Sequence, residues 1–165
     1  MIRAAAAKDA DSLGQLHVET WQAAYRGEFP DEYLDGLDVG GRIDWFRRAI
    51  EEEREILVAE ADGWAVGFAS FGRSRSNEWG EIYAVYVHPD HWGEGHGFQL
   101  MAAAETRLSE IGFDQALLWV LDSNTQARSF YERQDWTLGR PVKLDEIGGV
   151  QVTEVRYEKQ LRDAT

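Results

Sequence analysis

Apolar positions recur along the chain with two periods, one typical of strands and the other of helices. Strands are expected where apolar residues alternate with polar ones or form short runs, and helices where they recur every three or four residues. The expected strands cover residues 2–5, 56–61, 64–71, 81–87, 115–121, 136–144 and 150–159. A first helix is expected to begin near residue 9 or 11. Further helices are expected at 30–37, 41–53, after residue 97, and at 124–134. This order of hairpins around one strand–helix–strand crossover predicts an α/β fold with a mixed, mostly antiparallel central sheet flanked by helices on both faces.

The segment between the expected strand 81–87 and the next helix is rich in glycine and carries the clearest functional signal. It reads Val87-His88-Pro89-Asp90-His91-Trp92-Gly93-Glu94-Gly95-His96-Gly97, and the helical run after it has apolar residues at Leu100, Met101, Ala104, Leu108 and Ile111. Glycines let a backbone approach a ligand closely, and the positive end of a helix attracts negative charge. A strand, a glycine turn and a helix in this order predict a phosphate or pyrophosphate site.

Length, charge and cysteine content narrow the classes of protein to which the chain can belong. Its 165 residues suit one domain with a proper core, so a single domain over residues 1–165 is expected. The formal net charge of −13 disfavours nucleic acid and anionic membranes as partners and is compatible with a cationic substrate such as an amine. The absence of cysteine excludes disulfides and a cysteine nucleophile. Residues 1–9 do not resemble a signal peptide and no apolar run is long enough to cross a membrane, so a cytoplasmic location is expected.

Two motifs, each at a strand–helix junction, resemble the GNAT superfamily of acyl-CoA-dependent N-acyltransferases. The glycine turn stands as Trp92-x-x-Gly95-x-Gly97 and is similar to the pyrophosphate motif of that family, Gln/Arg-x-x-Gly-x-Gly/Ala. The second motif, 124–131, contains asparagine, alanine and a Phe-Tyr pair in the spacing Asn-x-x-Ala-x-x-Phe-Tyr and follows the expected strand 115–121. The resemblance covers nearly the whole chain and implies a GNAT-like fold, forming a single N-acetyltransferase domain that uses acetyl-CoA as cosubstrate.

The resemblance also implies which residues contact the cosubstrate. Val85 and Val87 are expected to offer backbone groups to the pantetheine arm, because the corresponding strand of the family splays from its neighbour. Asn124 is expected to contact the pantetheine or a bound water and also to cap its helix. The full set of expected contacts is Val85, Val87, Trp92, Gly93, Glu94, Gly95, His96, Gly97 and Asn124.

Four positions depart from the family pattern. Trp92 replaces the usual glutamine or arginine, and Glu94 lies where a basic residue is common. Phe98 occupies a position at which small residues are frequent, and Asp135 one at which glycine often follows the second motif. The backbone donors of the turn remain, but the side chains no longer help, and a carboxylate at Glu94 would repel a pyrophosphate that it faced.

Two residues are expected to act in catalysis. Tyr131 is similar in position to the tyrosine that protonates the departing CoA thiolate in the family, although a core role is the alternative because it shares a helix face with Ala127 and Phe130. Glu81 begins an otherwise apolar strand face and corresponds to the general base of the histone acetyltransferase branch, which acts through water. The alternative for Glu81 is that it has no catalytic role and is a solvated glutamate at the end of a strand. Glu28 is the competing candidate for the general base.

Further side chains suggest an acceptor pocket and a metal site. Trp21, Tyr25 and Tyr33 are candidates to line the pocket, with core packing as the alternative. The three histidines of the glycine turn are close in sequence, but they lack a helical pair with an acidic partner, so no metal is expected.

We therefore expect an N-acetyltransferase that moves an acetyl group from acetyl-CoA to a primary amine of a small molecule or peptide by direct attack in a ternary complex. The alternatives are a catalytically silent acyl-CoA-binding sensor domain and a protein N-terminal or lysine acetyltransferase. The expected partner is the amine acceptor, with no nucleic acid and no membrane, and a homodimer is left open.

Overall fold

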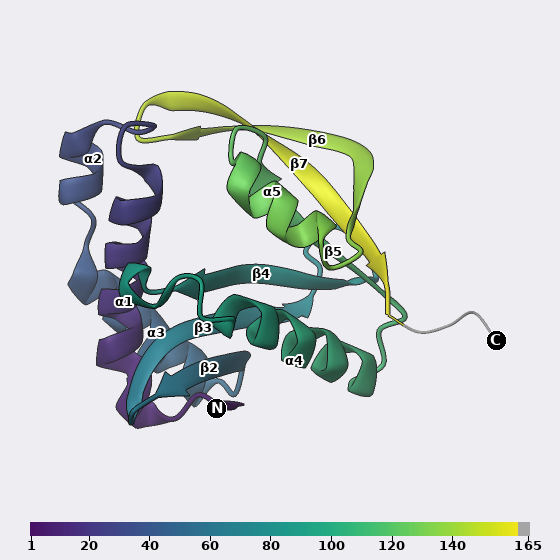
Figure 1. Cartoon of the computed structure of the whole chain (residues 1–165), viewed down its shortest axis with the longest axis horizontal. Coiled ribbons are helices and arrows are strands. Elements are labelled where there is room, and N and C mark those ends of the chain that lie inside the picture. The colour runs from purple at the N-terminus through teal and green to yellow at the C-terminus, as the bar shows by residue number, and fades with distance from the viewer. Residues whose placement is uncertain (162–165) are drawn as a thin grey trace. The chain divides into compact units, whose positions relative to one another are not determined.

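The computed structural model describes residues 1–161 (Figure 1). They divide into two compact units, the first made of Met1–Phe71 with Ala84–Ala104 and the second of Gly72–Tyr83 with the chain from Glu105 onwards. No helix among the described residues is long and apolar enough to cross a membrane.

Helices and strands alternate much as the apolar pattern predicts. The first half of the chain contains β1 (Ile2–Ala4), α1 (Ala10–Tyr25), α2 (Asp31–Asp35), α3 (Val39–Glu51), β2 (Glu55–Ala61) and β3 (Trp64–Arg73). The second half contains β4 (Gly80–Val87), α4 (His96–Glu110), β5 (Gln115–Leu121), α5 (Thr125–Glu132), β6 (Thr137–Ile147) and β7 (Val150–Gln160). Short 3₁₀ turns cover Ala7–Asp9 and Pro89–His91.

The strands form one seven-stranded sheet in the order β1-β2-β3-β4-β5-β7-β6. Neighbours pair antiparallel in β1–β2, β2–β3, β5–β7 and β6–β7, whereas β4 and β5 are parallel. The prediction of a mixed, mostly antiparallel sheet is therefore confirmed. The parallel ladder has two residue pairs, Gly80 with Ala116 and Glu81 with Leu117, although β4 continues to Val87.

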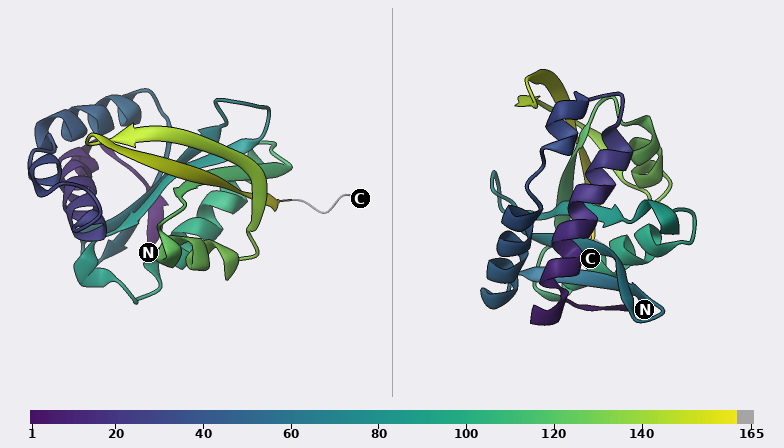
Figure 2. Two further views of the ribbon diagram at one scale, coloured as in Figure 1. Left: turned by 90° about the horizontal axis from the view of Figure 1, so that it is seen from above. Right: turned by 90° about the vertical axis from the view of Figure 1, so that its left-hand side faces the viewer.

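Helices cover both faces of the sheet within the first unit, as Figure 2 also shows. Phe68 on β3 belongs to a buried cluster with Leu13 of α1 and Phe46 of α3. The preceding residue, Gly67, points to the opposite face, where a Cβ atom would lie 3.2 Å from the side chain of Leu100 on α4. Alternate residues of one strand therefore face different helices, as the period of a strand requires.

The predicted start of the first helix near residue 9 or 11 is confirmed, since α1 begins at Ala10 with Asp9 as its N-cap residue. The Asp9 side chain does not bond to the helix, because its carboxylate accepts the Ala6 N–H at 2.7 Å and pairs with Arg3 at 2.8 Å, which ties the turn before the helix to β1. One local prediction is wrong. Ile111 is not part of the buried face of α4, because the helix ends at Glu110 and the Ile111 side chain is 41% exposed. The other four apolar positions of that face are fully buried.

Candidate active site

The glycine turn follows β4 and leads directly into α4, as the sequence predicts. Gly93 and Gly95 have φ angles of +81° and +86°, in the left-handed region that other residues rarely adopt. A Cβ atom built on either glycine would meet no heavy atom within 4 Å, so open space borders the backbone there. The turn thus offers uncovered backbone at the positive end of a 15-residue helix, which is an arrangement suited to an anion.

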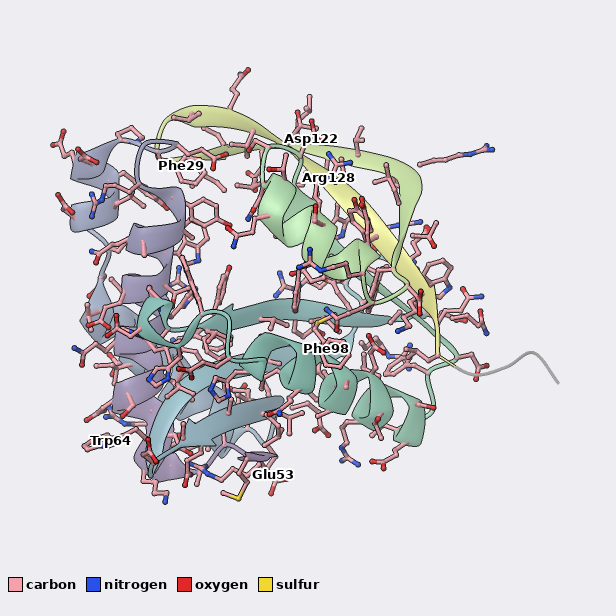
Figure 3. The ribbon with its side chains drawn as sticks, viewed as in Figure 1. Phe29, Glu53, Trp64, Phe98, Asp122 and Arg128 are labelled. Carbon is pink, nitrogen blue, oxygen red and sulfur yellow. The ribbon has the colours of Figure 1, made fainter. Side chains whose placement is uncertain are left out.

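Trp92 fastens the turn to the end of β4. Its indole N–H donates a hydrogen bond to the Val87 carbonyl at 2.6 Å, while 47% of the residue stays exposed. The tryptophan that replaces the usual polar side chain therefore fixes the geometry of the turn. Phe98, the next departure from the family pattern, lies on α4 with 58% of its surface exposed (Figure 3).

Glu94 is bonded to two histidines of the same turn. Its Oε2 lies 2.9 Å from Nδ1 of His91 and 3.0 Å from Nε2 of His96. These hydrogen bonds, first that from His91 and then that from His96, lower the pKa of the Glu94 carboxyl below its usual value. Hydrogen bonding to two imidazoles disperses the charge of this carboxylate, so it opposes a neighbouring phosphate less than an isolated carboxylate would.

Glu94 is thus an acidic partner for two of the histidines, which no helical pattern in the sequence indicated. The ligand atoms of His91, Glu94 and His96 all lie within 4.8 Å of one another, so within residues 1–161 this is the group that could hold a metal ion. The hydrogen bonds among them already account for the arrangement. His88 is not part of it, because its Nε2 lies 2.8 Å from Oε2 of Glu19 on α1.

Glu81 is a buried carboxylate. It is 9% exposed and accepts a hydrogen bond at 3.1 Å from the hydroxyl of Ser74, which is itself 6% exposed. The alternative of a solvated glutamate at the end of a strand is therefore wrong for this side chain. Glu81 also occupies the last pair of the β4–β5 ladder, the point at which regular pairing between these strands stops. Glu28, the competing base, is exposed and lies just after α1.

The second motif forms the short helix α5, and Asn124 caps it. The Asn124 side chain accepts the Ala127 N–H at 3.1 Å, which confirms the predicted cap. Arg128 anchors the helix through hydrogen bonds to Asp122 at 2.7 Å (Figure 3) and to the Tyr157 hydroxyl at 3.1 Å. The same hydroxyl donates to Glu132 at 2.5 Å, so two successive turns of α5 are fastened to β7.

Tyr131 lies on this anchored helix and is partly exposed. Its ring is centred 5.4 Å from that of Phe130 and 6.2 Å from that of the fully buried Tyr157. The side chain both packs against these rings and retains access to solvent, which is compatible with the catalytic role and with the core role. Asp135, which follows the helix, has a φ of 66° and so adopts the left-handed conformation for which glycine is common at this position.

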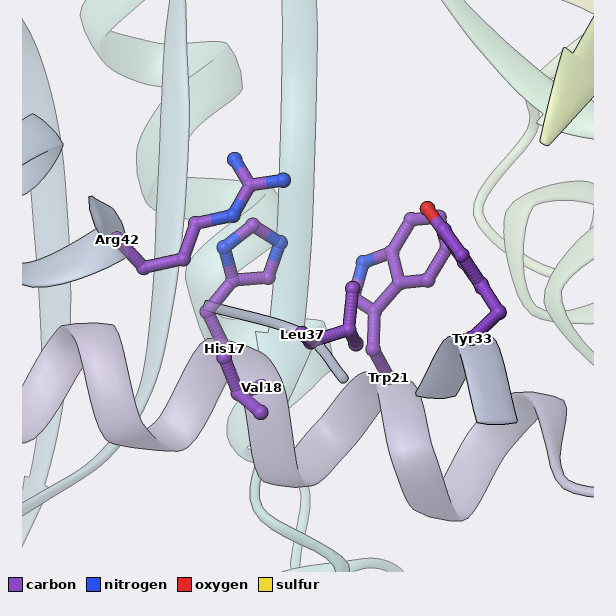
Figure 4. Close-up of a pocket in the computed structure, with 6 residues that line it drawn as sticks. All are labelled: His17, Val18, Trp21, Tyr33, Leu37 and Arg42. Carbon is purple, nitrogen blue, oxygen red and sulfur yellow. The ribbon is translucent and has the colours of Figure 1, made fainter. Parts of the chain in front are cut away.

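A small, open pocket of about 20 Å³ lies among α1, α2 and α3 of the first unit (Figure 4). Trp21 and Tyr33 line it, as proposed from the sequence, whereas Tyr25 is 8% exposed and belongs to the core. The remaining lining residues were not predictable, because no periodicity distinguishes them from their neighbours: His17, Val18, Leu37 and Arg42.

His17 is a neutral imidazole in this pocket. Burial, followed by the charge of Arg42, lowers its pKa from 6.5 to about 4. Its Nδ1 has no hydrogen-bond partner among residues 1–161. The ring stacks on that of Tyr86, with centroids 5.2 Å apart and an angle of 25° between the planes.

This pKa predicts a loss of stability in mild acid. The unfolded chain binds a proton at His17 near pH 6.5, but the folded chain does so only near pH 4, so the free energy of unfolding should fall between these values and level off below them. The difference corresponds to about 3 kcal/mol, at about 1.4 kcal/mol per pH unit. Urea unfolding of the native protein and of His17→Phe at pH 7, 5.5 and 4 measures this, and parallel curves for the two proteins would contradict it.

Comparisons with known proteins agree with this geometry. A model of the acetyltransferase (GNAT) family matches residues 11–136. The uncharacterized N-acetyltransferase YuaI of Bacillus subtilis is 31% identical over 160 residues, which cover 93% of this chain and 89% of YuaI. The L-amino acid N-acyltransferase MnaT of Escherichia coli is 39% identical over 94 residues, which cover 55% of this chain and 54% of MnaT.

Solved structures share the fold. The PaiA N-acetyltransferase of Thermoplasma acidophilum, crystallised in complex with coenzyme A, has a TM-score of 0.73 and 21% identity over 97% of this chain and 98% of its own. The fold and the glycine turn define the class of acetyl-CoA-dependent N-acetyltransferases. The chain belongs to the GNAT family.

Proposed function

We propose that this enzyme transfers the acetyl group of acetyl-CoA to the primary amine of a small molecule, by direct attack of the amine on the thioester in a ternary complex. The observation that carries the choice of a small molecule is the pocket lined by Trp21 and Tyr33, whose aromatic walls suit a compact acceptor. The similarity to MnaT, an L-amino acid N-acyltransferase, supports this choice. The absence of cysteine favours direct attack over an acyl-cysteine intermediate.

We assign the cosubstrate to the glycine turn and its neighbours. The backbone of Trp92–Gly97 would hold the pyrophosphate, since Gly93 and Gly95 border open space and α4 begins at His96. Val85 and Val87 would offer backbone groups of β4 to the pantetheine arm. Asn124 would add a contact through the part of its amide that the helix cap leaves unused.

The reaction needs a base for the amine and an acid for the thiolate. An alkylammonium has a pKa of about 10, so it must lose a proton before its nitrogen can attack the thioester carbonyl. Glu81 would receive this proton through a water molecule. As the tetrahedral intermediate collapses, the carbon–sulfur bond breaks and Tyr131 would give its phenolic proton to the sulfur. The second proton lost by the attacking nitrogen would then restore the phenol through water. The position of Glu81 supports its role, because its buried carboxylate is held by the Ser74 hydroxyl and Glu81 lies on β4, the strand assigned to the cosubstrate.

The proposed function is tested by thiol release from acetyl-CoA with a panel of amines. Because the protein contains no cysteine, every thiol detected belongs to CoA. The panel includes amino acids, alkyl and aryl amines, polyamines and short peptides with free N-termini. Turnover with a small amine supports the proposal, preferred turnover of peptides would favour a protein acetyltransferase, and acetyl-CoA binding without turnover across the panel would favour a sensor domain.

Glu81→Gln should lower the rate mainly at neutral pH and recover in part at high pH, where more of the amine is already neutral. The expected loss near pH 7 is roughly ten- to a thousandfold, the usual range for a general base. Glu28→Gln, which removes the competing carboxylate, is the matched control and should leave the profile unchanged. Profiles of kcat against pH decide between them. An equal loss at every pH in Glu81→Gln would point to a structural role, and a selective loss in Glu28→Gln would transfer the role to that residue.

A further inference from the structure

We propose that the pocket between α1 and α3 binds a carboxylate group of the acceptor, so that the substrate is an amine that carries a carboxylate, such as a free amino acid. Arg42 is the residue that would bind this carboxylate. The inference rests on the proposed function and adds the substrate class to it.

Arg42 is a cation without a carboxylate partner at the wall of the pocket. Among residues 1–161 no acidic side chain pairs with it, although the chain carries a net charge of −13. Arg26 pairs with Asp31 and Asp35, and Arg47 pairs with Asp11 and Asp44. Arg48 of α3 also has no acidic partner among residues 1–161, but unlike Arg42 it does not line the pocket. A guanidinium that lines a pocket and has no acidic partner is suited to a carboxylate ligand, which it can bind through two parallel hydrogen bonds.

The acid nearest to Arg42 in sequence is already engaged. Asp38 is the N-cap of α3, and its side chain accepts the Gly41 N–H at 3.0 Å. Arg42 lies one residue further along, in the first turn of this 13-residue helix, where the partial positive charge of the helix end adds to that of the guanidinium. Both features favour an anionic group at this end of the pocket.

The rest of the pocket carries no negative charge. Its other lining residues are apolar or aromatic, apart from His17, which burial keeps neutral. Figure 4 shows Arg42 and His17 on one side and Trp21 and Tyr33 on the other. A ligand with a carboxylate at one end and an apolar or aromatic group at the other would place its carboxylate at Arg42 and its apolar group against the aromatic rings. A polyamine would instead place a second positive charge near Arg42 with no acid to receive it.

The pocket also contacts the strand that we assign to the cosubstrate. The Trp21 indole donates to the Tyr86 hydroxyl at 3.1 Å, and the Tyr86 ring stacks on His17. Tyr86 lies on β4 between Val85 and Val87, the residues proposed to contact the pantetheine arm. An acceptor held by the pocket is therefore adjacent to this strand within the same unit.

The test compares acceptors that differ only in the carboxylate. We expect kcat/KM for L-phenylalanine and L-leucine to exceed that for phenethylamine, isoamylamine and the two amino-acid amides by roughly ten- to a hundredfold, the range for a charge-assisted hydrogen bond to a charged group. Arg42→Gln should abolish this preference by lowering kcat/KM for the acids alone. Arg48→Gln, which removes an exposed arginine of the same helix that does not line the pocket, is the matched control and should retain it.

Equal kcat/KM for acids and decarboxylated amines, or a preference for spermidine, would overturn the inference while leaving the proposed function intact. If no amine is turned over, the proposed function fails, and calorimetric binding of L-phenylalanine decides the inference by itself. Binding by the native protein that is lost in Arg42→Gln, but not in Arg48→Gln, supports the carboxylate site. The absence of such binding overturns it.

Discussion

Tyr131→Phe is expected to lower kcat by roughly ten- to a thousandfold, with little change in the affinity for acetyl-CoA. The substitution removes one hydroxyl from a ring that packs beside Phe130 and Tyr157, so α5 should remain in place. A tyrosine phenol is protonated at pH 7 and can donate to the thiolate as it forms, and losing an acid of this kind usually costs a factor in that range. Thiol release under saturating substrates measures kcat, and calorimetry measures acetyl-CoA binding.

Tyr83→Phe is the control for this prediction. Tyr83 is exposed on β4, and its hydroxyl donates to the Arg73 carbonyl, so we assign it no part in catalysis. Its variant should keep the native kcat. Full activity in Tyr131→Phe would exclude the acid role, and a matching loss in Tyr83→Phe would indicate a general effect of removing a hydroxyl.

Gly95→Val is expected to abolish acetyl-CoA binding. Valine would be strained at a φ of +86°, and its branched side chain would fill the open space through which the backbone meets the pyrophosphate. For the native protein, acetyl-CoA at a hundred times its dissociation constant should add about 2.7 kcal/mol to the free energy of unfolding. Thermal unfolding with and without acetyl-CoA measures this gain, which the variant should lack.

Gly63→Val separates loss of binding from backbone strain. Gly63 has a φ of +82° and equally open surroundings, but it lies in the β2–β3 hairpin. Its variant should be destabilised to a similar degree and still gain stability from acetyl-CoA. Retained binding in Gly95→Val would show that the pyrophosphate is held elsewhere.

Elements with a strong local signal were predictable from the sequence. The hairpin between the expected strands 56–61 and 64–71 is confirmed. Its turn has φ angles of 52° at Asp62 and 82° at Gly63, a conformation that aspartate and glycine adopt more readily than most residues. The buried face of α4 follows from the helical period, and the cap at Asn124 from the preference of asparagine for that position. These features depend on residues close in sequence, whose geometry is set by local sterics and hydrogen bonds.

Contacts between distant or irregular segments were not predictable in the same way. The hydrogen bond from Ser74 to Glu81 joins a loop to a strand, so neither the strand repeat nor the helix repeat of apolar positions indicates it. The bonds of Glu94 to His91 and His96 depend on side-chain rotamers in a turn that has no regular repeat. The net charge of the whole chain does not indicate the charge at the pocket, where the one charged lining residue is Arg42.

All six residues of the pocket lie in one continuous stretch of chain, from His17 to Arg42. The glycine turn, Glu81 and Tyr131 lie outside it. Under the proposed function, mutations in this stretch would alter acceptor choice during evolution while the proposed machinery for acetyl transfer is inherited unchanged. Enzymes with different acceptors would then arise through changes in one segment of the chain.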